Sequence, residues 1–301
     1  MKIHAVCAIK NEADIIEQTL RAAAAWCDWI YVLDNGSTDG TWETVQKLGG
    51  ELPGVVPYKQ DPRPFDFELR GDLLRHYVTR AKRGDWWCIL DADEIYIDDP
   101  RQFLKAVPRR YKSVYQFQYI YQFTDAELSL YERSPADYHA TPVDERMRHY
   151  VVDDYSEMRF FRHRRGLKGV PAIVHPVYPK RIRLKHFMYR SPEQIAMRLA
   201  TRREPMERGE WLHEKRANWT VGASVQDLKA GPALADDLEQ SWRERVTSSS
   251  LCHFDGRDGT YADVAVWSVP PSPGLYSALD AYARRAVRAI RRRMQSLLGT
   301  K

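Results

Sequence analysis

The residues best suited to chemistry are the acids of Asp91-Ala92-Asp93-Glu94. They directly follow Trp86-Trp87-Cys88-Ile89-Leu90, a short apolar run that predicts a buried strand. Two carboxylates at positions i and i+2 carry a large desolvation cost there unless a cation meets them. A divalent metal ion that carries a diphosphate meets this need, because hard cations prefer oxygen ligands and share them with phosphates. The stretch therefore predicts a metal–diphosphate site.

Further polar clusters follow other apolar runs in the first hundred residues. Strands are expected at 3–9, 30–33, 55–58 and 86–90, with helices that open at Asn11 and cover 42–48 and 68–82. Strands that alternate with helices predict parallel pairing in an α/β sheet. Their carboxyl ends carry Lys10-Asn11-Glu12, Asp34-Asn35-Gly36 and Asp91-Ala92-Asp93. Because ligands bind beyond such ends, the three clusters are expected to converge on one site.

The pattern changes after Pro100. Residues 113–123 alternate between aromatic or β-branched side chains and others, which predicts a strand of a mixed sheet. Further short strands are expected at 158–161 and 181–185. Ser191-Pro192-Glu193-Gln194 predicts a helix start, with Ser191 as the cap and Gln194 closing a capping box. This helix is expected to reach about Arg208.

The composition is that of a soluble globular protein. The 301 residues are 44% apolar and 29% charged, with a net charge of +5. No stretch reaches the roughly 18 uncharged apolar residues that span a bilayer. The N-terminus begins a strand at once and has no signal-peptide pattern. A cytoplasmic location is therefore expected, with reduced thiols at Cys7, Cys27, Cys88 and Cys252.

The last segment is a basic amphipathic pattern over residues 275–298. Its apolar residues fall on one helical face, arginines occupy much of the rest, and no acid follows Asp280. Such a helix suits the anionic inner face of the cytoplasmic membrane, as a peripheral anchor. A solvated face docked on the catalytic domain explains the pattern equally well. Nucleic acid, which also attracts basic patches, is not the expected partner.

Three sequence blocks resemble those of family 2 glycosyltransferases of the GT-A fold. They are Val6-Cys7-Ala8-Ile9-Lys10-Asn11-Glu12, Val32 to Thr41 and Leu90 to Glu94. Their order and spacing both agree with the family over roughly residues 1–210. The resemblance implies a Rossmann-like, mostly parallel mixed sheet flanked by helices, with a C-terminal helical appendage. It divides the chain into a catalytic domain (1–220) and an extension (221–301). The nucleotide-sugar half of that domain covers about 1–100 and the acceptor half about 101–220.

The later half resembles the bacterial subgroup that builds lipopolysaccharide core and related surface glycans. The resemblance is carried by Arg159-Phe160-Phe161-Arg162, Val174-His175 and Lys185 to Ser191. A glutamate often follows that histidine in the subgroup, whereas this chain has Pro176. The implied activity is metal-dependent, inverting transfer of a sugar from a nucleotide-diphosphate sugar to a hydroxyl of a glycan or lipid-linked acceptor.

The resemblance also implies roles for the polar clusters. Asp93 would ligate Mn²⁺ or Mg²⁺, with Asp91 on the ribose or the metal's water shell and His186 completing the metal shell. The alternatives are a turn carboxylate pair for the acids and a structural role for His186. The expected nucleotide-sugar contacts are Asn11, Glu12, Asp34, Asn35, Arg70, Asp91 and Ala92. Asp34 could equally start an Asx turn, and Glu12 could be a first-turn dipole partner.

The general base must be a carboxylate or histidine near the acceptor hydroxyl. Asp154 is favoured, with Asp153 and Glu157 as rivals, because family members often place acceptor-side acids before the strand at 158–161. An acidic loop is the plain alternative for each. The aromatic residues of 113–123 could stack on acceptor sugars, but packing in the core with only alternate residues exposed is the simpler expectation.

Three other classes of protein are the alternatives. A nucleotidyltransferase would use the same carboxylate–metal chemistry but normally has a glycine-rich loop after the first strand, and Ala8 to Glu12 contains no glycine. A phosphatase with an aspartyl nucleophile usually carries its Asp-x-Asp motif after the first strand, whereas three strands precede Asp91 here. A non-catalytic glycan-binding protein of the same fold is the other alternative, and the intact acid pair argues against it.

Overall fold

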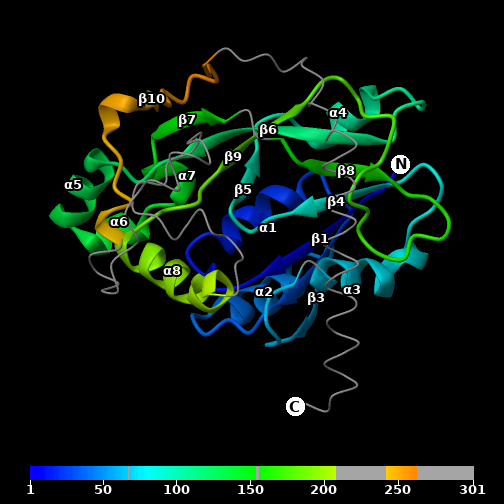
Figure 1. Ribbon diagram of the computed structural model, residues 1–301, viewed down its shortest axis with the longest axis horizontal. Coiled ribbons are helices and arrows are strands. Elements are labelled where there is room, and N and C mark those ends of the chain that lie inside the picture. Colours follow the sequence, from blue (N-terminus) through cyan, green and yellow to red (C-terminus); the bar gives the residue numbers. More distant parts are fainter. Residues whose placement is uncertain (67, 154–155, 208–241, 263–301) are drawn as a thin grey trace.

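The computed structural model describes residues 1–66, 68–153, 156–207 and 242–262, arranged around one mixed sheet flanked by helices (Figure 1). The strand order is β10-β7-β6-β8-β4-β1-β2-β3, and a further strand, β9, pairs with both β6 and β5. The α/β class and the mixed sheet are confirmed. The basic helix expected at 275–298 lies outside the described residues.

The amino-terminal part alternates strands and helices as expected. Strands β3, β2, β1 and β4 lie side by side in that order and are parallel. Their bounds are β1 Ile3–Ile9, β2 Trp29–Asp34, β3 Val55–Gln60 and β4 Trp86–Leu90. The intervening helices are α1 Ile16–Ala24, α2 Thr41–Glu51, α3 Glu68–Tyr77 and the short η1 Val78–Arg80. The carboxyl ends of β1, β2 and β4 therefore share one edge of the sheet.

The later strands extend this sheet with mainly antiparallel pairing. Strand β8 pairs with β4 and β6, while β9 lies parallel to β6. The strands are β5 Glu94–Tyr96, β6 Ser113–Tyr121, β7 His149–Asp153, β8 Met158–Arg162, β9 Ile182–His186 and β10 His253–Phe254. The helices are α4 Pro100–Ala106, α5 Asp125–Arg133, α6 Pro135–Ala140, α7 Val143–Arg146, α8 Pro192–Glu207 and η3 Ser249–Leu251.

The continuous apolar character of β1 follows from burial on both faces of the sheet. Ala5, Cys7 and Ile9 belong to the core that includes the inner faces of α1 and α2. Val6 points to the other face, into the core formed with Leu69 and Leu73 of α3. Within the described residues, no helix is long and apolar enough to cross a membrane.

The first helix begins later than expected, at Ile16 instead of Asn11. The backbone N–H groups of residues 11–13 are occupied by side chains of the β2–α2 loop, which holds this stretch in a non-helical path. Asn11 itself has a left-handed backbone, with φ of 54°. The helix-start interpretation of Asn11 and Glu12 is therefore wrong, and both residues belong to a loop.

The aromatic strand β6 is buried along its whole length, so the expectation of alternately exposed residues is wrong. Tyr115 packs in the core beneath α3, whereas Phe117, Tyr119 and Tyr121 pack in a third core that includes Phe187 and Ile195. The strand lies inside the sheet with side chains covering both faces. Its rings are consequently core residues, and none is more than 6% exposed.

Candidate active site

Two loops are cross-linked at the carboxyl ends of β1 and β2. The backbone N–H of Asn11 donates to Ser37 Oγ at 2.9 Å, and Asn11 Oδ1 accepts from the backbone N–H of Thr38 at 2.9 Å. The N–H of Glu12 donates to Thr41 Oγ1 at 2.8 Å. Because short polar residues satisfy the backbone of both loops, this edge has a defined shape before any ligand binds.

Asp34 and Asn35 are buried at the end of β2, and each has one oxygen without a partner in the described part of the chain. Asp34 Oδ1 accepts from the N–H groups of Gly36 and Ser37 at 2.9 and 2.8 Å, which forms the Asx turn that was the alternative interpretation of this residue. Its Oδ2 has no partner among the residues that the structure describes. The Asn35 amide donates to two carbonyls of residues 61–63 and thereby fixes that loop. An orphaned buried acceptor is costly, so Asp34 Oδ2 is available to a ligand donor.

Asp91 lies between two arginines at the end of β4. One is Arg70 of α3, which forms an ion pair with Oδ1, and the other is Arg159 of β8, 3.1 Å from Oδ2. Arg159 also contacts Glu94, and its Nη1 lies 3.1 Å from Glu157 Oε2. One buried guanidinium therefore joins three carboxylates, which lie at the end of β4 and at the starts of β5 and β8. Sequence reasoning placed Arg70 here but did not anticipate Arg159 as a partner of the acids.

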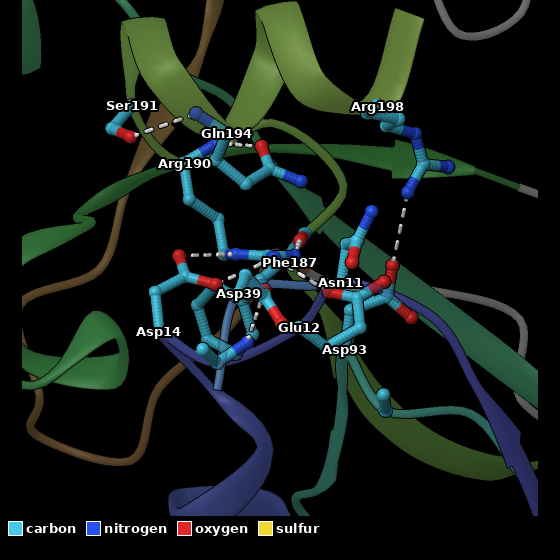
Figure 2. A network of polar contacts seen from close by, with 12 residues as sticks. Asn11, Glu12, Asp14, Asp39, Asp93, Phe187, Arg190, Ser191, Gln194 and Arg198 are labelled. Carbon is cyan, nitrogen blue, oxygen red and sulfur yellow. Dashed lines mark hydrogen bonds and ion pairs between the residues drawn. The ribbon is translucent and has the colours of Figure 1, made fainter. Parts of the chain in front are cut away.

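Asp93 faces two cationic groups from the later part of the chain. His186 Nε2 at the end of β9 and Arg198 Nη1 on α8 lie 3.3 and 3.5 Å from Asp93 Oδ2, and Figure 2 shows Arg198 reaching down to it. Burial alone would raise the pKa of Asp93, but His186 and Arg198 outweigh it and hold that pKa well below its ordinary value. His186 and Asp93, predicted to act together, are thus in contact.

Ala92 and Glu94 have structural contacts within the acid motif. The hydroxyl of Thr19 on α1 donates to the Ala92 carbonyl at 2.5 Å, which ties the motif to the first helix. Burial raises the pKa of Glu94 to about 7, although Arg159 opposes the shift. Glu94 Oε2 has no partner in the described residues. Glu94, to which the sequence assigned no role, holds Arg159 against the motif.

A buried arginine on the chain just before α8 ties the site together. Arg190 is fully buried, and its Nη2 lies 2.6 Å from Glu12 Oε2 and 2.8 Å from Asp14 Oδ1 (Figure 2). Its Nη1 also donates to the Phe187 carbonyl at 2.7 Å. Burial raises the pKa of Glu12 to about 7, against the pull of Arg190. Glu12 therefore anchors α8 through Arg190.

The predicted helix start at Ser191 is correct, but its capping box is only half formed. Ser191 Oγ accepts from the N–H of Gln194 at 3.3 Å, whereas Gln194 Oε1 accepts from the N–H of Arg190 at 3.1 Å instead of from Ser191. Figure 2 shows this arrangement directly above the Arg190 network. The cap thus also fixes the backbone of Arg190.

The three candidate bases have different positions. Glu157 is half-buried and joined to the acid motif through Arg159. Asp153 ends β7 and accepts from Gln118 Nε2 at 2.8 Å, so it lies against β6. Asp154 lies outside the described residues. Glu157 is therefore linked to Asp91 through Arg159, with which both carboxylates form ion pairs.

The chain is identified by its similarity to known proteins. Residues 5–170 match the family described as glycosyl transferase family 2. The match covers more than half of the chain, and the chain belongs to this family of enzymes. No curated protein matches it.

Several solved structures are similar over part of the chain. One is the mannosyltransferase PcManGT from Pyrobaculum calidifontis in complex with GDP-Man and Mn²⁺, at 18% identity and a TM-score of 0.31, covering 44% of this chain and 37% of that one. TarS 1-349 from S. aureus has 18% identity and a TM-score of 0.27, with coverages of 40% and 36%. Glucosyl-3-phosphoglycerate synthase from Mycobacterium tuberculosis with phosphoglyceric acid has 19% identity and a TM-score of 0.27, with coverages of 44% and 51%. The chain spans about a third to a half of these proteins, and the family assignment rests on the match to residues 5–170.

Proposed function

We propose that this protein transfers a sugar from a nucleoside-diphosphate sugar to a glycan hydroxyl, with a divalent metal ion. The observation that carries the proposal is the pairing of both motif acids with cations at the edge where β1, β2 and β4 end. Asp91 meets Arg70 and Arg159, and Asp93 meets His186 and Arg198. Such an arrangement suits a substrate that is itself a metal-bound polyanion, because protein cations and the metal can share its charge.

The side chains present fit a divalent cation that a diphosphate helps to hold. Within the described ranges, no group of three His, Cys, Asp or Glu side chains is arranged to hold a metal by itself. Asp93 and His186 supply a carboxylate oxygen and an imidazole nitrogen, and this donor pair suits Mn²⁺ better than Mg²⁺. Phosphate and water oxygens would complete the shell. When bound, the metal supplies Lewis-acid stabilisation of the leaving diphosphate.

The chain's own residues would perform the remaining tasks. Asp34 Oδ2 would accept a hydrogen bond from the nucleoside, since it is buried and has no partner in the described residues. Arg198 would move from Asp93 to the diphosphate when the metal binds, because a metal ion and a guanidinium compete for the same carboxylate. Asp154, Asp153 or Glu157 would take the proton of the acceptor hydroxyl, with inversion at the anomeric carbon.

The acceptor is proposed to be a bacterial surface glycan or a lipid-linked precursor, as in lipopolysaccharide core synthesis. This finer assignment rests on the blocks around Arg159, His175 and Lys185 to Ser191. Arg159 of the first block forms an ion pair with Asp91, and Arg190 of the third forms one with Glu12.

Isothermal titration with UDP, GDP, dTDP and CMP, with and without Mn²⁺, tests the proposal. We expect one nucleotide to bind in a metal-dependent manner, and Asp93→Asn to abolish that binding while the protein remains folded. Glu132→Gln on the exposed surface of α5 is the matched control and should bind as the wild type does. Metal-independent binding, or no binding of any of the four, would refute the metal-dependent transferase.

A further inference from the structure

Three loops meet at the edge of the sheet opposite to the acid motif. They are residues 81–85 before β4, 105–112 from the last turn of α4 to β6, and 162–166 around the end of β8. The N–H of His163 donates to the Asp85 carbonyl at 2.8 Å, and the N–H of Arg162 donates to the Lys112 carbonyl at 2.9 Å. Because β4 runs from this edge to Asp91, the two edges are separated by the length of the strand, about 17 Å.

Asp85 is the one acidic residue in these three segments, and their other charged residues are lysines and arginines. Asp85 is buried, and its carboxylate accepts from the backbone N–H groups of Lys2 and Lys82 at 2.7 and 2.8 Å. The exposed basic residues of the loops, called the basic edge below, are Lys82, Arg83, Lys105, Arg109, Arg110, Arg164 and Arg165. In the part of the chain that the structure describes, none of them forms an ion pair with a carboxylate.

The basic edge is held in place by a residue that is not itself part of it. Arg162 lies over the ring of Trp86 at 4.2 Å and donates to the carbonyls of Tyr111 and Val107 at 3.0 and 3.1 Å. It therefore links two loops to the start of β4. By contrast, Arg159 and Arg190 at the other edge are each paired with at least two acids. The arginines at the acid-motif edge are therefore neutralised by carboxylates, whereas the basic edge presents positive charge that no carboxylate of the described residues neutralises.

We propose that the basic edge docks this protein on an anionic lipid bilayer. Clustered cations repel one another, and an anionic surface within a Debye length relieves that repulsion for all of them together. A single-stranded nucleic acid would need exposed rings for stacking. The large exposed apolar side chains of the described residues include no aromatic residue from these loops, and Arg110 covers the ring of Tyr111 at 4.7 Å. Duplex DNA would need a helix or ribbon for its groove, and the edge consists of loops.

Docking through the basic edge would fix the orientation of the protein on the bilayer. With the basic edge on the bilayer, the acid motif faces away from the lipid, since it lies at the other end of β4. The acceptor would then reach the site as a glycan that projects from the surface. The basic edge consists of residues between 82 and 165, and its assignment does not use the segment at 275–298.

Sedimentation of the full chain with vesicles tests the proposal. The vesicles contain phosphatidylcholine alone or with phosphatidylglycerol, at low and high salt. We expect binding only to the anionic vesicles, lost at high salt, and reduced roughly tenfold by Arg109→Glu/Arg110→Glu and again by Arg164→Glu/Arg165→Glu. The control Lys47→Glu/Arg133→Glu makes the same change of charge at exposed sites on α2 and α5, and it should stay within about twofold of wild type.

Three results would overturn the proposal. They are unchanged binding by both edge variants, an equal loss in the control, or tighter binding to a DNA duplex than to the anionic vesicles at the same salt. Arg109→Gln/Arg110→Gln replaces the reversal if that variant misfolds. Metal-dependent nucleotide binding should be the same in all of these variants, so a failure here is distinct from a failure of the proposed transferase.

Discussion

Arg190 and Asp14, 176 residues apart in the sequence, form a two-point ion pair. Arg190 Nε lies 2.8 Å from Asp14 Oδ2, and Nη2 lies 2.8 Å from Oδ1. The pair fixes the start of α8 against the loop that follows β1. Arg198 lies eight positions further along, about two helical turns away. At that position its guanidinium reaches Asp93. The position of one cation at the site thus depends on a salt bridge outside it.

Replacement of this buried cation should strongly destabilise the fold. Arg190→Met leaves Glu12 and Asp14 without their main partner, and we expect a loss of about 3–5 kcal/mol in the free energy of unfolding. Urea denaturation measures it. Arg21→Met is the control, because Arg21 forms exposed ion pairs with Glu17 and Glu51, and its loss should lower the free energy of unfolding far less than the loss of Arg190. Similar losses for the two variants would show that the buried network is unimportant.

Arg159 and Glu94 should be energetically coupled. Arg159→Met leaves the buried Glu94 carboxylate unpaired, whereas Arg159→Met/Glu94→Gln removes the uncompensated charge as well. The double variant should therefore be more stable than the sum of the single changes, by about 1–3 kcal/mol. A double-mutant cycle from urea titrations measures this coupling. If the losses of stability in the two single variants simply added up in the double variant, the proposed coupling of Arg159 and Glu94 would be wrong.

Arg198 should contribute to binding of the diphosphate but not of the nucleoside. Loss of a charged hydrogen bond in Arg198→Gln is expected to weaken Mn²⁺-pyrophosphate binding by roughly tenfold or more. Titration calorimetry with pyrophosphate measures it, and titration with nucleosides should give the wild-type result. Arg133→Gln on α5 serves as the control. Equal weakening of nucleoside binding would indicate a general disturbance of the site instead.

His4 should make the protein less stable in mild acid. Burial lowers the pKa of His4 below its ordinary 6.5, although Asp85 opposes the shift. The folded state therefore binds fewer protons than the unfolded state, so this stability is complete above pH 6.5 and is lost as the pH falls through the lower folded pKa. His4→Asn should reduce the fall in Tm between pH 7.5 and 5.5, while His76→Asn on the exposed surface should not. An unchanged slope in His4→Asn would contradict this assignment.

Elements with strong local patterns were predictable from the sequence. Strands β1 and β4 have the predicted bounds because both faces are buried, so each shows as an uninterrupted apolar run. The late start of α1 was not predictable. It depends on side chains from residues 37–41, which capture the backbone N–H groups of the loop after β1. Strand β5 was missed because it has only three residues, beginning with Glu94 of the acid motif, and so short a segment shows no periodicity.

By itself, the sequence determined the family and the acids at the ends of β1, β2 and β4, because these lie within short motifs of fixed spacing. Only the tertiary structure decided which cations meet those acids. Arg159, Arg190 and Arg198 reach Asp91, Glu12 and Asp93 across long stretches of chain. An ion pair between distant segments leaves no local signal in a sequence, since its geometry is set by how the helices and strands pack.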